Sequence, residues 1–214
     1  MAPLFGAASR ANAAIHDYFP LYTVGGKWKH DSEVWTNWCE GFLGGMLWII
    51  YRHAGDAWWR ERAQHYSRLI EHRKTDREVH HLGFLFIPTW KAWYDLGSDS
   101  TINQVVIDAE KTLALRFQPK GRYLKSFVSQ DSIFIDIMTN VGIIFYAACQ
   151  TKDASLLQIA VDHCLTTRRF LVRGDASTSQ ANNPTRMAQR FELGTWTNLG
   201  YLRFHDSLSI YPRR

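Results

Sequence analysis

Proline is absent from two long stretches of the chain, residues 21–87 and 120–183. A proline inside a helix removes a backbone hydrogen bond and clashes with the preceding turn, so both stretches are free to be helical. They hold the first and the third of three successive pairs of segments, each made of an apolar segment, a short turn and an amphipathic segment. The chain therefore favours an all-α fold built from helical pairs.

The first pair shows the pattern. A stripe of apolar positions over 42–53 predicts a helix that is buried on most of its surface and ends at Gly55. Asp56 is a suitable N-cap for a second helix over 57–73. The stripe of the first helix consists of Phe42, Met46, Ile49, Ile50 and His53. The buried face of the second is expected to consist of Trp59, Ala63, Tyr66 and Ile70.

The second pair joins Thr89–Leu96 to Ile102–Phe117, and the third joins Ile133–Cys149 to Ala154–Leu171. In the last of these helices the expected buried face carries Leu156, Leu157, Ala160, Cys164 and Leu165. An apolar helix followed by an amphipathic one suits the inner and outer layers of an α/α arrangement, because only the outer helix keeps a wet face. We predict a partial α/α barrel domain over residues 1–180.

The C-terminal part lacks this regularity. Residues 173–184 are polar and are expected to form a loop, and residues 191–214 carry aromatic side chains and glycines without a sustained helical or strand period. We therefore assign 181–214 to an irregular C-terminal segment.

Composition excludes several classes of protein. The three cysteines are odd in number and far apart, which suggests neither a disulfide framework nor a thiolate zinc site. No basic leader and no apolar run long enough to span a membrane is evident, so we expect a soluble, cytoplasmic protein without a membrane partner. The net charge of +5 is spread along the chain and does not indicate a nucleic-acid partner. No phosphate-binding glycine motif occurs, and Gly41, Gly44 and Gly45 are expected to permit close helix packing.

Reactive side chains gather just before the apolar helices, in residues 35–38, 80–84 and 135–140. If these helices run parallel, their N-terminal ends meet on one face and the side chains converge on a pocket. Asp136 lies between two isoleucines, where loss of water would raise its pKa toward general acid/base service. The alternative is that Asp136 caps a helix.

The aromatic and imidazole groups of these segments allow two interpretations each. Trp35 and Trp38 are suited to stack on the apolar face of a sugar ring, and core packing is an equal alternative. His80 and His81 suggest a metal site, but adjacent histidines point apart on a helix. Neither an H-x-x-x-H nor an H-E-x-x-H motif accompanies them. We therefore expect neither a metal nor another cofactor.

Four ordered motifs carry a resemblance to a known family. They are Trp35–Asn37 with Gly41–Phe42 and Leu47–Trp48, then His80–Phe86, Ile135–Asn140 and Val172–Thr178. Over residues 28–180 the chain resembles the unsaturated glucuronyl hydrolases of glycoside hydrolase family 88. The resemblance implies a six-hairpin α/α barrel that removes unsaturated uronic acid from the nonreducing end of oligosaccharides. An aspartic acid in that family protonates the C4=C5 vinyl ether, and water then adds at C5.

The resemblance also assigns roles to residues. Asp136 matches the acid/base, while Trp35, Asn37 and His80 match groups that meet the sugar. Phe84 and Asn140 lie in the same motifs and complete the expected substrate contacts.

The chain departs from the family pattern at three points. His81 stands where the family has a second carboxylate, and as a catalytic-site residue it is expected to contact substrate hydroxyls. Gln180 stands where a family histidine is expected, and about half of the barrel is absent. Two functions remain open: a hydrolase whose partner is an unsaturated oligosaccharide, or an inactive α/α scaffold that binds oligosaccharide or protein. The open barrel edge also predicts self-association.

Overall fold

The structure is a computed structural model, and it describes residues 17–30 and 38–182. The described chain begins with a hairpin of β1 (Tyr22–Val24) and β2 (Lys27–Lys29). The helices that follow are α2 (Glu40–Ala54), α3 (Ala57–Leu69), the 3₁₀-helix η2 (Glu71–Thr75), α4 (Leu82–Phe86), the π-helix η3 (Ile87–Lys91), α5 (Ala92–Gly97), α6 (Ser100–Ala114), α7 (Ile137–Asn140), α8 (Gly142–Thr151) and α9 (Ala154–Leu171). Two further small antiparallel sheets pair β3 (Phe117–Gln118) with β4 (Tyr123–Leu124), and β5 (Ile133–Phe134) with β6 (Ala181–Asn182).

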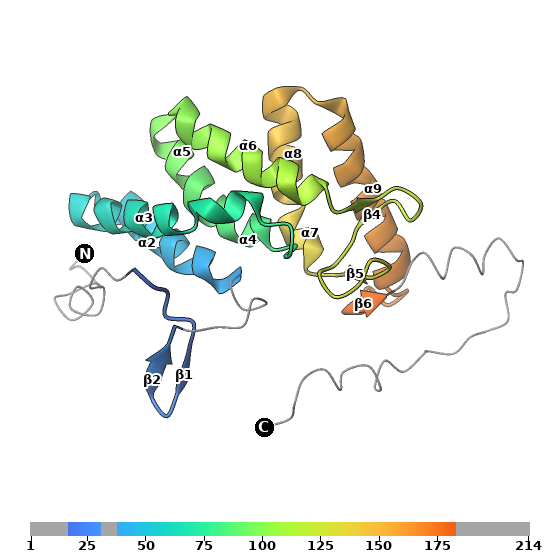
Figure 1. Cartoon of the computed structure of the whole chain (residues 1–214), viewed down its shortest axis with the longest axis horizontal. Helices are drawn as coiled ribbons and strands as arrows, with labels where there is room; N and C mark the ends of the chain where they lie inside the picture. The colour runs from blue at the N-terminus through green and yellow to red at the C-terminus, as the bar shows by residue number, and fades with distance from the viewer. Residues whose placement is uncertain (1–16, 31–37, 183–214) are drawn as a thin grey trace, which may run out of the picture.

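The three expected helical pairs are present, which confirms the all-α class (Figure 1). They are α2 with α3, the run from α4 through η3 and α5 with α6, and α8 with α9. In each turn, the aspartate at position 56, 99 or 153 accepts a hydrogen bond from the backbone N–H two residues ahead, at 2.8–2.9 Å. The residue before each aspartate has a left-handed backbone that ends the preceding helix. The turns therefore form from local interactions that the sequence encodes.

Close packing between the first two apolar helices depends on glycine, as expected. A Cβ added to Gly44 would lie 2.8 Å from the Thr89 side chain, and one added to Gly45 would lie 2.6 Å from Pro88. A Cβ at Gly41 would collide with the backbone of Phe84 and Leu85 within α4. Side chains at these three positions would force α2 away from α4 and η3.

The bounds of several helices differ from the expected ones. The second apolar helix begins at Leu82, and a π-helical turn that contains Pro88 carries it into α5. A π-turn can accommodate a proline because it already departs from the regular hydrogen-bond ladder. The third apolar segment is divided, since residues 133–134 pair as a strand and helix begins only at Ile137. The first outer helix ends at Leu69, and η2 follows it.

The buried face matches the expectation on α3, matches it in part on α9, where Leu156 and Ala160 are buried, and differs on α2. Phe42, Met46 and Ile49 are 40%, 54% and 57% exposed, so the stripe expected in the core faces outward. Leu157 and Leu165 are also exposed. The residues that α9 buries are Leu156, Ala160, Asp162, His163, Thr166, Thr167 and Leu171. Periodicity identified these two helices, but a helix with apolar residues on several sides does not by itself define which side is buried.

The polar loop after α9 returns to the body of the protein. β6 pairs with β5, so residues 181–182 pack beside the segment that leads to Asp136. The domain boundary at residue 180 stays a prediction, because most of the C-terminal segment lies outside the described residues. Among the described helices, none is both long and apolar enough to cross a lipid bilayer.

Candidate active site

Helices α4 and α7 pack side by side, and the residues just before them bring two of the sequence motifs together (Figure 1). His81 immediately precedes α4, and Asp136 immediately precedes α7. Gly83 allows this approach, because a Cβ there would lie 2.5 Å from the backbone of Asn140. The expected convergence of helix N-termini is therefore present for these two motifs.

One carboxylate oxygen of Asp136 lies between two imidazoles. Its Oδ2 is 3.3 Å from His80 Nε2 and 3.4 Å from His81 Nε2. Both histidines are buried, whereas the Asp136 side chain is 38% exposed. The carboxylate is thus the member of this cluster that solvent or a small ligand can reach most easily.

The backbone determines which nitrogen of His80 carries the proton. Phe127 donates its backbone N–H to His80 Nδ1 at 3.1 Å, so Nδ1 is the acceptor and the neutral ring carries its proton on Nε2. Burial lowers the pKa of His80 to about 4, so the ring is neutral near pH 7. His80 therefore donates to Asp136 through Nε2.

The ionisation of Asp136 is opposite to the expectation. Burial by itself would raise its pKa, but the hydrogen bonds from His80 and His81 outweigh burial and hold the pKa well below its usual range. Asp136 is therefore a carboxylate at neutral pH. The capping alternative also fails, because its side chain makes no hydrogen bond to the first turn of α7.

The two histidines do not point apart, contrary to the expectation. They precede α4 instead of lying within it, and their ring centroids are 4.1 Å apart. The ligand atoms of His80, His81 and Asp136 all lie within 4.8 Å of one another, a spacing that a metal ion can bridge. However, the proton on His80 Nε2 occupies the lone pair that a metal would need, which leaves two ligands where protein sites usually provide three or more. The absence of a metal stays a prediction and now depends on this hydrogen-bond pattern.

Asn140 joins the two motifs. Its Oδ1 accepts the Phe84 backbone N–H at 2.8 Å, and its Nδ2 donates to the Asp136 backbone carbonyl at 3.0 Å. The side chain is fully buried, so the structure gives it a positioning contact. Direct contact of Asn140 and of the equally buried His80 with a substrate stays a prediction.

Aromatic side chains line one side of the cluster. Phe84 stacks on His81 with ring centroids 6.1 Å apart and an interplanar angle of 15°, and Trp38 lies 5.6 Å from Phe84. Phe127 packs on His80 at 5.0 Å. The predicted contacts Trp35 and Asn37 lie outside the described residues, so Trp38 and Phe84 are the described aromatic candidates for stacking on a sugar.

Two residues of the site were missed by sequence reasoning. Phe127 supplies the N–H that orients His80. Arg116 is buried and donates to the backbone carbonyls of Arg77 and Ser126, which ties together the segments that carry His80 and Phe127. Neither Phe127 nor Arg116 lies in a recognisable motif. The signal in the sequence for Arg116 is a charged side chain among apolar residues near the end of an amphipathic helix.

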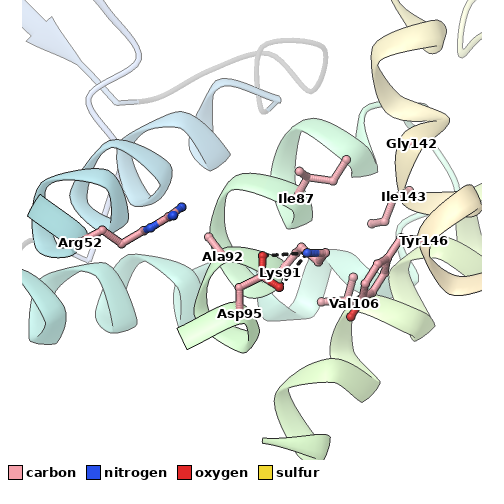
Figure 2. A pocket seen from close by; sticks show the side chains of 9 residues that line it. All are labelled: Arg52, Ile87, Lys91, Ala92, Asp95, Val106, Gly142, Ile143 and Tyr146. Atoms are coloured by element: carbon pink, nitrogen blue, oxygen red, sulfur yellow. Dashed lines mark hydrogen bonds and ion pairs between the residues drawn. The ribbon is translucent and has the colours of Figure 1, made fainter. Parts of the chain in front are cut away.

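A pocket of about 320 Å³ lies elsewhere, between α2, α5, α6 and α8 (Figure 2). Its polar lining is Arg52, Lys91, Asp95 and Tyr146, and Lys91 pairs with Asp95 at 2.7 Å. None of the predicted site residues lines this pocket. The His80, His81 and Asp136 cluster is therefore the better candidate for chemistry.

Known proteins with a similar sequence or structure indicate what the chain as a whole resembles. No protein-family model matches the chain. Among curated proteins, the chain is 30% identical over 182 residues to the unsaturated glucuronyl hydrolase of Bacillus sp. strain GL1. The matched region covers 80% of this chain and 48% of that protein. It is 29% identical over 150 residues to the unsaturated chondroitin disaccharide hydrolase of Streptococcus agalactiae serotype III strain NEM316. That match covers 66% of this chain and 38% of the relative.

The solved structure of the Bacillus sp. GL1 hydrolase matches with a TM-score of 0.73 at 28% identity, over 79% of this chain and 48% of that one. Over about 80% of its length, this chain is similar in sequence and structure to the unsaturated glucuronyl hydrolases. It spans 48% and 38% of the lengths of these two curated relatives, which is less than half of each. An unsaturated glucuronyl hydrolase specific for heparin matches at a TM-score of 0.75 and 20% identity, and supports the α/α toroid fold alone.

Proposed function

We propose that this hydrolase homologue acts on unsaturated uronic acid at the nonreducing end of an oligosaccharide, with Asp136 as its proton carrier. The observation that carries the proposal is the partly exposed Asp136 side chain, which lies against His81 beside the rings of Phe84 and Trp38, where α4 packs on α7. A solved relative from Streptococcus agalactiae, at 25% identity and a TM-score of 0.63, is complexed with dGlcA-GalNAc6S. That complex supports a short, anionic, unsaturated substrate.

The chemistry needs one group that can give and then accept a proton. In its acid form Asp136 transfers a proton to C4 of the C4=C5 vinyl ether, and water adds to the resulting cation at C5. The carboxylate left behind takes the proton released by that water, which restores the acid. The product at C5 is a hemiketal, which opens and releases the rest of the oligosaccharide. Trp38 and Phe84 offer aromatic surface to the apolar face of the sugar.

The two histidines oppose the first of these steps. Because they donate hydrogen bonds to Asp136 and lower its pKa, only a small fraction of Asp136 is protonated near neutral pH. The carboxylate form suits the second step, in which it accepts the proton from water. The expected result is a slow hydrolase whose rate rises as the pH falls through the mildly acidic range.

A direct assay tests the proposal. An unsaturated chondroitin disaccharide is added to the protein, and loss of the ultraviolet absorbance of its conjugated double bond reports turnover. Asp136→Asn should abolish the signal, because an amide cannot deliver the proton. Asp131→Asn, a control in the same segment, should retain it.

Two results would reject the proposal. One is turnover by the Asp136→Asn protein at the wild-type rate. The other is a folded wild-type chain that binds the disaccharide without consuming it between pH 4 and pH 8, which would instead support the scaffold function.

A further inference from the structure

The hairpin of β1 and β2 projects away from the helical body (Figure 1). Its turn is Gly25-Gly26 with φ of +57° and +74°, a left-handed conformation that glycine adopts readily and that tight hairpins require. The base is held, because Leu21 packs on the core and donates its backbone N–H to the Lys29 carbonyl at 2.8 Å. The base of the hairpin is therefore attached to the core, and its turn extends away from the helices.

One face of the hairpin combines apolar side chains with two cations. Tyr22 pairs with Lys29 and Val24 with Lys27, and directly paired residues point to the same side of a sheet. Tyr22 and Val24 are 47% and 56% exposed. In the part of the chain that the structure describes, no carboxylate pairs with either lysine. Trp28 points to the opposite side.

This composition does little for the stability of the fold. Two strands of three residues are marginal by themselves, and a large exposed apolar side chain gives up the favourable free energy of burial. Within the described residues, Lys27 and Lys29 contribute no ion pair to the hairpin. A role in binding accounts for an exposed ring beside two unneutralised ammonium groups.

We propose that the face formed by Tyr22, Val24, Lys27 and Lys29 is a second carbohydrate site, which binds an anionic glycan at a distance from the reacting end. Ammonium groups attract carboxylates and sulfates, and the tyrosine ring offers an apolar surface to the C–H face of a sugar. The two lysines are about 7 Å apart along one strand, so they can engage two anionic groups of one chain. The choice of a uronic-acid-containing glycan over another anion rests on the proposed function. This face then holds the body of a longer chain.

Binding of a saturated chondroitin sulfate hexasaccharide tests this site separately from turnover, because the probe lacks the double bond that the Asp136 chemistry needs. Calorimetric titration of the full chain should show binding that weakens as salt is added. Lys27→Gln combined with Lys29→Gln should lower the affinity about three- to tenfold, the range expected for two exposed charge contacts. Tyr22→Ala should lower it further, with unchanged circular dichroism.

Matched controls locate the effect. Lys111→Gln with Lys120→Gln removes the same charge from other exposed positions and should leave affinity within twofold of wild type, as should Trp28→Ala on the opposite face. Asp136→Asn should bind the hexasaccharide like wild type, so a failure of the proposed function would leave this result intact. Equal weakening by both lysine pairs, equal binding of duplex DNA, or no binding of the hexasaccharide would overturn the proposal.

Discussion

At the scale of single residues, the charge of Asp136 depends on its two histidine neighbours. Replacing His81 with aspartate removes one donor and adds a like charge, and both changes raise the pKa of Asp136. Since the first chemical step needs the protonated acid, a higher pKa increases the active fraction at a given pH. We expect His81→Asp to raise turnover of an unsaturated disaccharide. The pH at which turnover falls should be higher than in wild type by about one unit or more.

The variant His81→Gln separates the two contributions. It removes the imidazole without adding a negative charge, so its pH profile should lie between those of wild type and His81→Asp. Identical profiles for all three proteins, measured with folding verified, would show that His81 does not influence the acid.

A second residue with a perturbed charge is Glu110, which is fully buried on α6. Neither carboxylate oxygen has a hydrogen-bond partner among the described residues, and burial raises the pKa of this side chain to about 8. The folded state therefore holds a proton that the unfolded state releases at a lower pH, and stability should fall as the pH rises from about 4.5 to about 8. Glu110→Gln should remove that dependence and raise the free energy of unfolding at pH 7.5 by about 1–3 kcal/mol.

Urea denaturation at several pH values checks this prediction. The slope of stability against pH should be shallower in Glu110→Gln than in wild type across this range. Parallel curves would contradict it.

At the scale of elements, the contact between α4 and α7 positions the site. Gly83 lies against the backbone of Asn140, and backbone cannot move aside as a side chain can. Gly83→Ala should therefore destabilise the fold by about 1–3 kcal/mol and separate His81 from Asp136. Gly97→Ala is the control, because a Cβ at this helical position meets no atom within 4 Å and should be neutral or slightly stabilising.

Thermal unfolding of the two glycine variants gives the comparison. If both melt at the wild-type temperature, the approach of the two helices is less tight than the structure indicates.

At the scale of the whole molecule, the outward face of α2 is the largest departure from the expected burial. Phe42, Met46 and Ile49 form an exposed apolar stripe on one helix, and such patches commonly mediate association. We predict that the chain self-associates reversibly and that Met46→Glu with Ile49→Glu keeps it monomeric. Leu157→Glu, at an exposed apolar position on α9, should not change association.

Sedimentation velocity over a wide concentration range measures this directly. A wild-type protein that remains monomeric at every concentration would exclude the α2 face as an interface.

Much of the fold could be predicted from the sequence, because it depends on local interactions. Asp56, Asp99 and Asp153 cap helices through bonds to residues two positions ahead, so the three pairs and their turns follow from neighbours in the chain. The face of α3 was also foreseeable, because its apolar residues lie on a single side. The recognisable motifs identified Asp136 and the histidines as candidates for the same reason: each is a short run of sequence.

Only the tertiary structure decided what these residues do to one another. His80 and Asp136 are 56 positions apart, and no pattern along the chain states that both imidazoles would reach one carboxylate oxygen. The sign of the Asp136 pKa shift followed from that contact, since hydrogen-bond donors opposed the burial that the apolar neighbours had suggested. The amino-acid sequence by itself determined the three helical pairs, the turns between them and the identity of the reactive groups, because these depend on near neighbours. The burial of α2 depends on how distant segments pack, and the charge of Asp136 depends on the electrostatic field and hydrogen bonds of distant residues. Both exist only once the chain has folded.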